Sequence, residues 1–245
     1  MVENMKQYIY GKNTILEALK GDTKIYTVYL LQNSKDAKII QACKQNKVAL
    51  EIVDKAFFDK KAKGAVHQGV MATIEEYRYY GVEEILHGIP EGKQPLLVML
   101  DGLEDPHNLG AILRTCDAIG VDGVIVGKNR SVRLNSTVAK VSTGAIDHIK
   151  VASVTNLTRT LEELKQQSFW VVGCDLQDAV DYRSVDYNMP LVVVIGSEGK
   201  GISRLVRQSC DIKVTLPMVG HVTSLNASVA TAILLYQIHS IRHPL

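Results

Sequence analysis

Two polar loops late in the chain carry residue types that could bind a small ligand. The first loop, residues 196–203, reads Gly-Ser-Glu-Gly-Lys-Gly-Ile-Ser and follows the apolar run at 191–195. The second loop, residues 217–228, contains Ser224 and Asn226 and leads into another apolar run. In α/β proteins, ligands bind at the loops that follow the carboxyl ends of parallel strands. The pattern therefore predicts one ligand site to which both loops contribute.

The glycines of the first loop do not fit the common phosphate-binding motifs. Gly196, Gly199 and Gly201 are spaced G-x-x-G-x-G, the reverse of the dinucleotide motif G-x-G-x-x-G. In a P-loop the lysine precedes Ser or Thr, whereas Lys200 precedes a glycine. A plain strand-to-helix turn is the alternative. We favour a ligand site for two reasons. Glycines allow the backbone to approach a ligand closely. In a plain turn, Glu198 would contribute only a negative charge near the start of the next helix.

A third polar segment, residues 101–110, contains Asn108. Asparagine is a good N-cap, so Asn108 could simply start the helix predicted over residues 109–119. Arg114 lies six residues further on, where its long side chain can reach back toward the helix start or the sheet edge. A surface or ion-paired arginine is the alternative. We retain a functional role for Arg114 because two other polar loops are expected near it.

Composition limits the class of protein. With 245 residues, of which 46% are hydrophobic, the chain can bury one large core or a medium core plus a small one. No apolar run is long enough for a membrane span, and the first twelve residues lack the apolar stretch of a secretion signal. The four cysteines form no C-x-x-C pair, and the seven histidines are dispersed. We expect a cytoplasmic protein with no membrane segment and no bound metal.

Positive charge is concentrated in the first third of the chain. Residues 1–77 hold 12 Lys, no Arg and 9 Asp or Glu, a net charge of +3. The remaining residues hold 16 basic and 17 acidic side chains, a net charge of −1. A lysine surplus of this kind fits either contact with nucleic acid or an ordinary solvated surface.

Apolar patterns divide the chain into two α/β blocks. The first has helices predicted over residues 14–20 and 34–46 and strands over 25–31, 48–53 and 69–74. Residues 78–94 mix charges with Gly and Pro and are predicted to be a linker with a short helix near 82–87. The second block has strands predicted over 96–100, 123–126, 169–174, 191–195 and 212–216 and helices over 109–119, 157–167, 202–208 and 227–241. Apolar strands that alternate with helices predict an α/β fold whose mostly parallel sheet is covered on both faces.

Three segments together resemble a known family. Residues 101–115 read D-x-L-x-D-P-x-N-L-G-A-I-x-R-T, residues 192–202 read V-V-V-I-G-S-E-G-K-G-I, and residues 216–230 contain L-P-M and S-L-N-A-S-V-A. They resemble the three motifs of the SpoU (TrmH) family of RNA ribose methyltransferases in the SPOUT superfamily. The opening Y-I-Y-G-K-N-T-I-L-E-A-L and the H-Q-G-V at 67–70 resemble the substrate-binding domain of its ribosomal RNA guanosine branch, the RlmB-like enzymes. The resemblance covers nearly the whole chain.

The resemblance implies a fold and an activity. It implies a trefoil-knotted SPOUT catalytic domain over residues 95–245, joined by the linker to a small L30e-like RNA-binding domain over residues 1–77. It also implies S-adenosylmethionine as methyl donor and a homodimer formed through the catalytic domain. The acceptor would be a ribose 2′-hydroxyl, and we expect it to belong to a guanosine of 23S ribosomal RNA.

The resemblance assigns site residues by position. Those that match catalytic positions of the family are Asn108, Arg114, Glu198, Ser224 and Asn226. Those that match the cofactor pocket are Gly196, Ser197, Gly199, Leu216, Met218, Ser224, Leu225 and Asn226. Leucine and methionine side chains suit this role because adenine and a methylthio group need apolar walls.

Elementary chemistry limits the roles of these residues. A guanidinium with a pKa above about 12 rarely loses its proton, so we expect Arg114 to hold an RNA phosphate and stabilise developing alkoxide charge. The proton of the 2′-hydroxyl would leave to a phosphate oxygen or water, and Glu198 is the other candidate acceptor. Ser224 would lie beside the target ribose, and Asn226 would order its loop against Asn108 or Glu198. Alternatively, Ser224 or Asn226 simply caps the last helix.

Other functions stay open at this point. The RNA could be a transfer RNA, since the chemistry of methyl transfer is the same. A non-catalytic RNA-binding or ribosome-assembly protein of the same fold would lack Arg114 or the glycine loop, and this chain has both. A nucleotide- or NAD-dependent enzyme is disfavoured by the order of the glycines.

Overall fold

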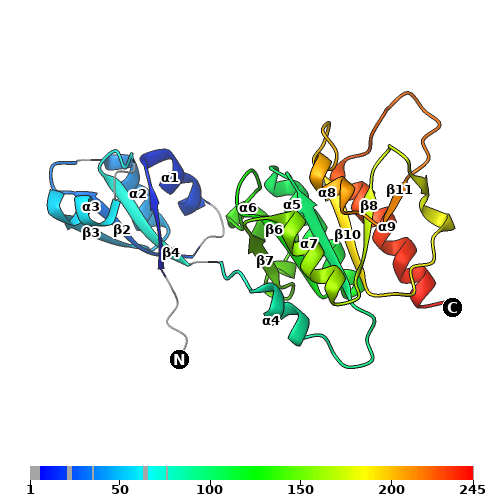
Figure 1. The fold of residues 1–245 in the computed structure, drawn as a ribbon. Helices are drawn as coiled ribbons and strands as arrows, with labels where there is room; N and C mark the ends of the chain where they lie inside the picture. Colours follow the sequence, from blue (N-terminus) through cyan, green and yellow to red (C-terminus); the bar gives the residue numbers. More distant parts are fainter. Residues whose placement is uncertain (1–5, 21–23, 35, 63–65, 76, 245) are drawn as a thin grey trace. The chain divides into compact units, whose positions relative to one another are not determined.

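The computed structural model describes residues 6–20, 24–34, 36–62, 66–75 and 77–244. It divides into two compact units, Met1–Tyr77 and Arg78–Leu245 (Figure 1). Each unit has its own apolar core.

The first unit is a small α/β domain. Its elements are β1 (Lys6–Tyr10), α1 (Lys12–Lys20), β2 (Ile25–Leu31), α2 (Ala37–Gln45), β3 (Ala49–Val53), α3 (Lys55–Ala62) and β4 (Val70–Glu75). In the described part of this unit the strands form one sheet in the order β1-β4-β2-β3, in which β4 is antiparallel to β1 and β2. Ile15 and Leu19 of α1 and Ile39 and Cys43 of α2 are buried in a single core against β2 and β4.

The second unit has three layers. It contains α4 (Val82–His87), β5 (Leu96–Asp101), α5 (Pro106–Ile119), β6 (Gly123–Gly127), α6 (Ser136–Ser142), β7 (Val151–Val154), α7 (Leu157–Gln166), β8 (Trp170–Cys174), β9 (Val180–Asp181), β10 (Leu191–Gly196), α8 (Arg204–Gln208), β11 (Ile212–Thr215) and α9 (Ala227–Arg242). Among the described residues, seven strands pair in the order β7-β6-β5-β10-β8-β11-β9, and every pair is parallel. The predicted α/β fold with a mostly parallel sheet is confirmed.

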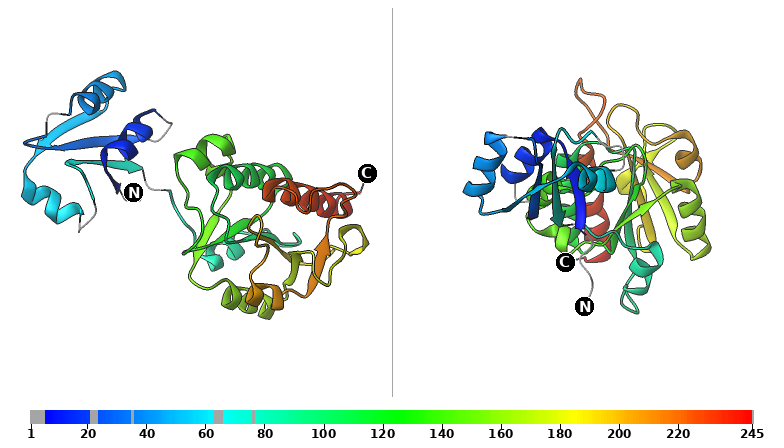
Figure 2. Two further views of the ribbon diagram at one scale, coloured as in Figure 1. Left: turned by 90° about the horizontal axis from the view of Figure 1, so that it is seen from above. Right: turned by 90° about the vertical axis from the view of Figure 1, so that its left-hand side faces the viewer.

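Both faces of this sheet are buried. Side chains of β5 alternate between the two cores: Leu96, Val98 and Leu100 pack with α5, α6 and α9, whereas Leu97 and Met99 pack with α4, α7 and α8. The left view of Figure 2 shows α9 in red on one side of the sheet and α8 in orange on the other. Coverage of both faces explains why the central strands read as continuous apolar runs instead of alternating ones.

The start of α5 differs from the prediction. The helix begins at Pro106, three residues before the predicted start, because Asp105 accepts a hydrogen bond from the backbone N–H of His107 at 2.9 Å and proline is favoured in the first turn. The alternative in which Asn108 is the N-cap is therefore wrong. Asn108 lies inside the first turn, and its side chain is free to contact other loops.

The segment at residues 78–94, which the sequence predicts to be a linker, is part of the second unit. The backbone N–H of Tyr80 donates to the carbonyl of Val151 at 2.9 Å, and Ile85 of α4 is buried against the sheet. The short helix predicted near residues 82–87 is confirmed. It packs into the core of the second unit. Within the described ranges, no helix is both long and apolar enough to cross a membrane.

Candidate active site

The first polar loop folds back sharply on the end of β10. The backbone N–H of Gly201 donates to the carbonyl of Ser197 at 2.8 Å, and the N–H of Ser197 donates to the carbonyl of Gly201 at 3.2 Å. Gly199 and Gly201 have φ values of 81° and 64°, the left-handed region that glycine adopts without strain. This turn brings backbone close to Gly196: a Cβ there would meet the carbonyl carbon of Gly201 at 2.1 Å. The glycines are therefore required by the shape of the loop.

This packing makes Gly196→Ala a test of the loop. The added methyl group would overlap backbone atoms, which cannot rotate away, so we expect a loss of stability of at least about 1–3 kcal/mol and loss of cofactor binding. Gly220→Ala is the matched control, because among the described residues no atom beyond its chain neighbours lies within 4 Å of a Cβ at that position. Thermal unfolding and calorimetric titration with S-adenosylmethionine measure both effects. An unchanged melting temperature and an unchanged affinity for S-adenosylmethionine in Gly196→Ala would contradict this close packing of the turn.

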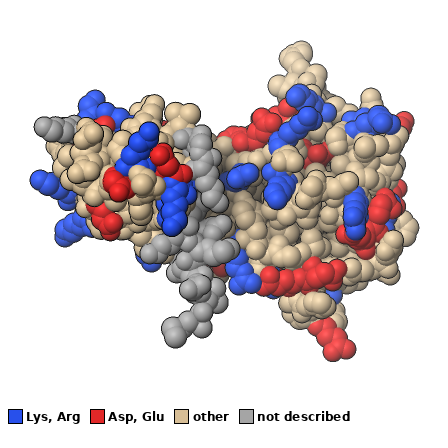
Figure 3. Space-filling view, turned by 60° about the vertical axis from the view of Figure 1, so that its left-hand side comes forward, with Lys and Arg blue, Asp and Glu red and all other residues tan. Residues whose placement is uncertain are grey.

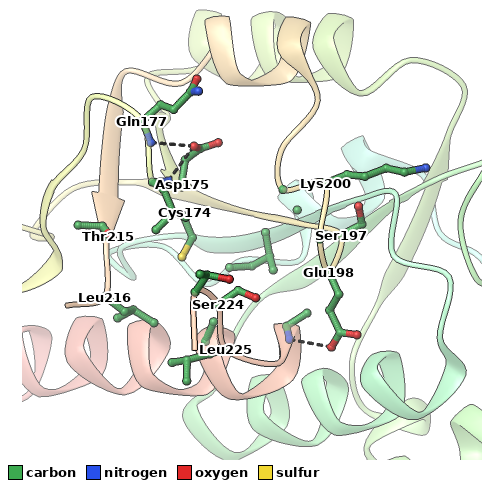
Figure 4. A pocket seen from close by; sticks show the side chains of 18 of the residues that line it. Cys174, Asp175, Gln177, Ser197, Glu198, Lys200, Thr215, Leu216, Ser224 and Leu225 are labelled. Carbon is green, nitrogen blue, oxygen red and sulfur yellow. Dashed lines mark hydrogen bonds between the residues drawn. The ribbon is translucent and has the colours of Figure 1, made fainter. Parts of the chain in front are cut away.

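A cavity of about 370 Å³ lies between this turn and the second polar loop (Figure 4). Leu216, Met218 and Leu225 contribute apolar side chains to its wall, and Ser224 lines it from the same loop. Seven of the eight residues predicted for the cofactor pocket line the cavity: Gly196, Ser197, Gly199, Leu216, Met218, Ser224 and Leu225. The eighth, Asn226, does not line it and instead contacts Glu198.

The Glu198 side chain is contacted by side chains from two distant parts of the chain. Its Oε1 accepts hydrogen bonds from Nδ2 of Asn226 at 2.6 Å and from Nδ2 of Asn108 at 3.1 Å. The backbone N–H of Ala227, at the start of α9, also donates to Oε1 at 3.2 Å. Nδ2 of Asn226 donates further to Oδ1 of Asn108 at 2.9 Å. One carboxylate therefore connects the three polar segments. In sequence, Asn108 is 90 residues from Glu198 and 118 residues from Asn226.

Asn226 does two things at once. Its Oδ1 accepts from the backbone N–H groups of Ser228 and Val229, at 3.0 and 3.3 Å, so it is the N-cap of α9. Its Nδ2 faces the other way, toward Asn108 and Glu198. The capping alternative and the expected contact across the site are both observed, because the two ends of one amide serve different partners.

Arg114 is a predicted catalytic residue that neither joins this cluster nor lines the cofactor cavity. Its side chain is exposed on α5 and lines neither the cavity beside Glu198 nor the neighbouring one. Asn108, on the same helix, is 5% exposed and takes part in the cluster. A role for Arg114 in the chemistry therefore requires a group that reaches it from outside this cavity.

One part of the cavity wall has no counterpart in the sequence prediction. Residues 174–177, which follow β8, line the cavity, and Arg207 fixes them: it donates to Asp175 at 2.7 Å and to Gln177 at 2.9 Å. Asp175 in turn accepts from the backbone N–H of Gln177 at 3.0 Å. The available signal was the strand itself, since the carboxyl end of a parallel strand beside β10 lies at the same sheet edge.

Comparison with known proteins now gives the family. Residues 95–236 match the model of the SpoU rRNA Methylase family, and residues 8–80 match a model described as RNA 2′-O ribose methyltransferase substrate binding. The chain belongs to the SpoU family of RNA methyltransferases. The family inferred from the three motifs is confirmed, as is the presence of an N-terminal substrate-binding domain.

Relatives of this SpoU family member support the assignment along the whole chain. YacO of Bacillus subtilis, whose name places it in the TrmH family of tRNA/rRNA methyltransferases, is 46% identical over 241 residues, covering 97% of this chain and 96% of that protein. The crystal structure of an rRNA methyltransferase from Sinorhizobium meliloti with bound AdoMet has a TM-score of 0.62 at 25% identity, covering 98% of this chain and 88% of that one. AviRb of Streptomyces viridochromogenes, also solved with AdoMet, shares the fold with a TM-score of 0.63 at 22% identity, covering 97% and 90%.

The cavity fits the methyl donor of these SpoU structures. S-adenosylmethionine combines an apolar adenine and methylthio group with polar ribose and amino-acid ends, so it needs a mixed wall. The wall of this cavity combines leucine and methionine side chains with serine and aspartate side chains and glycine backbone. Among the described residues no group of His, Cys, Asp and Glu side chains could hold a metal ion.

Proposed function

We propose that this protein transfers a methyl group from S-adenosylmethionine to a ribose 2′-hydroxyl of RNA. The observation that carries the proposal is the cluster of Asn108, Glu198 and Asn226 at the wall of the cofactor cavity. The match of residues 8–80 to a substrate-binding model of RNA 2′-O ribose methyltransferases supports ribose over base as the acceptor. We propose a guanosine of 23S ribosomal RNA as the target. Transfer RNA is the alternative, since the names of close relatives include both RNAs.

The residues of this chain would position the acceptor and assist its deprotonation. When bound, S-adenosylmethionine supplies an electrophilic methyl group on a sulfonium, which loses its positive charge as the methyl leaves. Little covalent chemistry is left to the protein, so alignment of the 2′-oxygen and removal of its proton dominate. We propose that the Glu198 cluster fixes the two loops that hold both reactants, with Ser224 beside the ribose.

A homodimer would explain why Arg114 and several apolar side chains of α9 are exposed. Val229, Ile233 and Tyr236 of α9 are exposed, at 46%, 37% and 54%, and their spacing places them along one side of the helix. α9 packs against α5, which carries Arg114 on its exposed side. We propose that two copies pair through α9 and α5, so that Arg114 of the partner subunit completes the site beside Glu198. We also propose that the second unit contains a trefoil knot and that the protein is cytoplasmic.

Mapping of ribose methylation tests the proposed function. RNA from cells with and without the protein would be compared for 2′-O-methyl groups in both ribosomal and transfer RNA. The proposal predicts one guanosine of large-subunit ribosomal RNA that loses its methyl group in the deletion strain. A lost methyl group in transfer RNA would favour the alternative, and an unchanged pattern would contradict the function in these cells.

The N-terminal unit is expected to supply RNA affinity. Figure 3 shows lysine side chains projecting around this unit, and residues 1–77 carry a net charge of +3. Removal of residues 1–77 should weaken RNA binding and make it less dependent on salt. In a plot of the logarithm of the binding constant against the logarithm of salt concentration, each lost phosphate contact reduces the slope by about 0.7 for single-stranded RNA. Calorimetric affinity for S-adenosylmethionine should stay unchanged, since the cofactor cavity lies in the second unit. Equal RNA affinity of the full and shortened chains would assign this unit another role.

A further inference from the structure

A second cavity lies beside the cofactor cavity and shares a wall with it. It has a volume of about 670 Å³ and includes Arg130, from the loop after β6, in its lining. Ser197, Glu198, Lys200 and Gly201 line both cavities. Only the turn formed by these residues would therefore separate a ligand in the second cavity from a ligand in the first.

Three of the four carboxylates that line this second cavity accept hydrogen bonds from protein groups, and the fourth, Glu104, is exposed. Asp101 accepts from the backbone N–H of Ser203 at 2.7 Å, and Asp105 caps α5. Glu198 is held by the amides of the cluster described above. The two cations of the lining differ: neither Arg130 nor Lys200 has a hydrogen bond or ion pair with any residue that the structure describes. Two positively charged side chains of this lining are therefore free to bind an anionic group.

The backbone holds Arg130 in an uncommon conformation. Its φ of 53° lies in the left-handed region, which non-glycine residues adopt rarely and mostly at turns and ligand-binding sites. The chain on its C-terminal side is fixed by two bonds: Val132 N–H donates to the carbonyl of Leu103, and Leu134 N–H donates to Oη of Tyr79, both at 2.7 Å. The base of the Arg130 side chain is thus attached to an anchored loop.

We propose that this second cavity receives the acceptor nucleotide and that Arg130, assisted by Lys200, binds a phosphate next to the reacting ribose. The inference rests on the proposed function, which requires an RNA segment beside the methyl donor. A guanidinium matches a phosphate with two parallel hydrogen bonds, and a lysine adds a point charge. A cavity of this volume lies within the range of sites that bind molecules of nucleotide size. Arg130 is a positioning residue in this account, distinct from Arg114.

Arg130→Gln and Arg133→Gln form a matched pair for the test. Both arginines are exposed, and both substitutions remove one positive charge from the same loop, but Arg133 does not line the cavity. The RNA affinity of each variant would be measured by filter binding to an unmodified large-subunit ribosomal RNA transcript, with S-adenosylhomocysteine present. We expect about 10- to 100-fold weaker binding for Arg130→Gln and only a small change for Arg133→Gln. Methyl transfer should fall with a raised KM for RNA, and S-adenosylmethionine affinity should not change.

Equal RNA affinities of the two variants would overturn the proposal, as would loss of cofactor binding in Arg130→Gln. Should Arg130→Gln fail to fold, Lys200→Gln carries the test, because Lys200 lies on an exposed turn. An unchanged RNA affinity of Lys200→Gln would then overturn it. A wild-type protein that binds this RNA but transfers no methyl group counts against the proposed function alone, since the comparison of affinities still decides the role of Arg130.

Discussion

Glu198→Ala is expected to lower kcat/KM for RNA by about 100-fold or more. The carboxylate accepts from two asparagine side chains and from the first turn of α9, so its removal releases loops that must hold donor and acceptor in line. A displacement of about 1 Å costs roughly 100-fold in such reactions. Steady-state methyl transfer to the RNA transcript measures the effect, and circular dichroism checks that the variant folds.

Glu198→Gln separates the two possible roles of this residue. Glutamine keeps an oxygen that can accept the same hydrogen bonds but cannot take up the proton of the 2′-hydroxyl. If Glu198 organises the loops, glutamine should retain most of the activity, with a loss of roughly 3- to 10-fold from the missing charge near the start of α9. A loss in Glu198→Gln as large as that in Glu198→Ala would identify Glu198 as the proton acceptor. Full activity of Glu198→Ala would remove it from the site.

Arg114→Ala is expected to lower kcat by about 100- to 1,000-fold without changing the affinity for S-adenosylmethionine. The side chain lines no part of the cofactor cavity, so cofactor binding should not depend on it. Arg114→Lys should recover little, because a point charge does not replace the two-pronged contact of a guanidinium with phosphate. Near-normal turnover of Arg114→Lys over a range of pH would contradict this role.

Mixing two inactive variants tests whether Arg114 acts across the proposed dimer. Arg114→Ala and Glu198→Ala protomers would be unfolded, mixed and refolded together. If each site uses Glu198 of one copy and Arg114 of the other, half of the dimers are mixed and each has one intact site, so about a quarter of wild-type activity should return. No recovery, with mixed dimers verified by mass spectrometry, would place Arg114 in the same subunit's site or outside the chemistry.

Much of the fold could be predicted because the central strands are continuously apolar. β5, β6, β8 and β10 were each located to within one residue of their observed ends. β1, β7 and β9 were missed: all three are edge strands, and their short stretches carry less apolar signal than the central ones. The early start of α5 follows from Asp105 and Pro106, a cap and first-turn pair that outweighed the Asn108 signal.

The candidate site was partly predictable for a different reason. The glycine loop and the loop ending at Asn226 carry distinctive residue types, so their convergence could be expected from strand ends alone. The wall formed by residues 174–177 could not be predicted in this way, because no local pattern marks it. It belongs to the site only because β8 pairs with β10, and the order of strands in a sheet depends on long-range pairing.

Methyl transfer by the purified protein tests the central claim most directly. Unmodified ribosomal RNA would be incubated with S-adenosylmethionine carrying a labelled methyl group, and the product would be hydrolysed with alkali. A methyl group on the 2′-oxygen blocks cleavage at the next phosphate, so the account predicts label in alkali-resistant dinucleotides and its loss in Glu198→Ala. Label in mononucleotides would show methylation of a base, and an absence of label in ribosomal and transfer RNA alike would contradict the account.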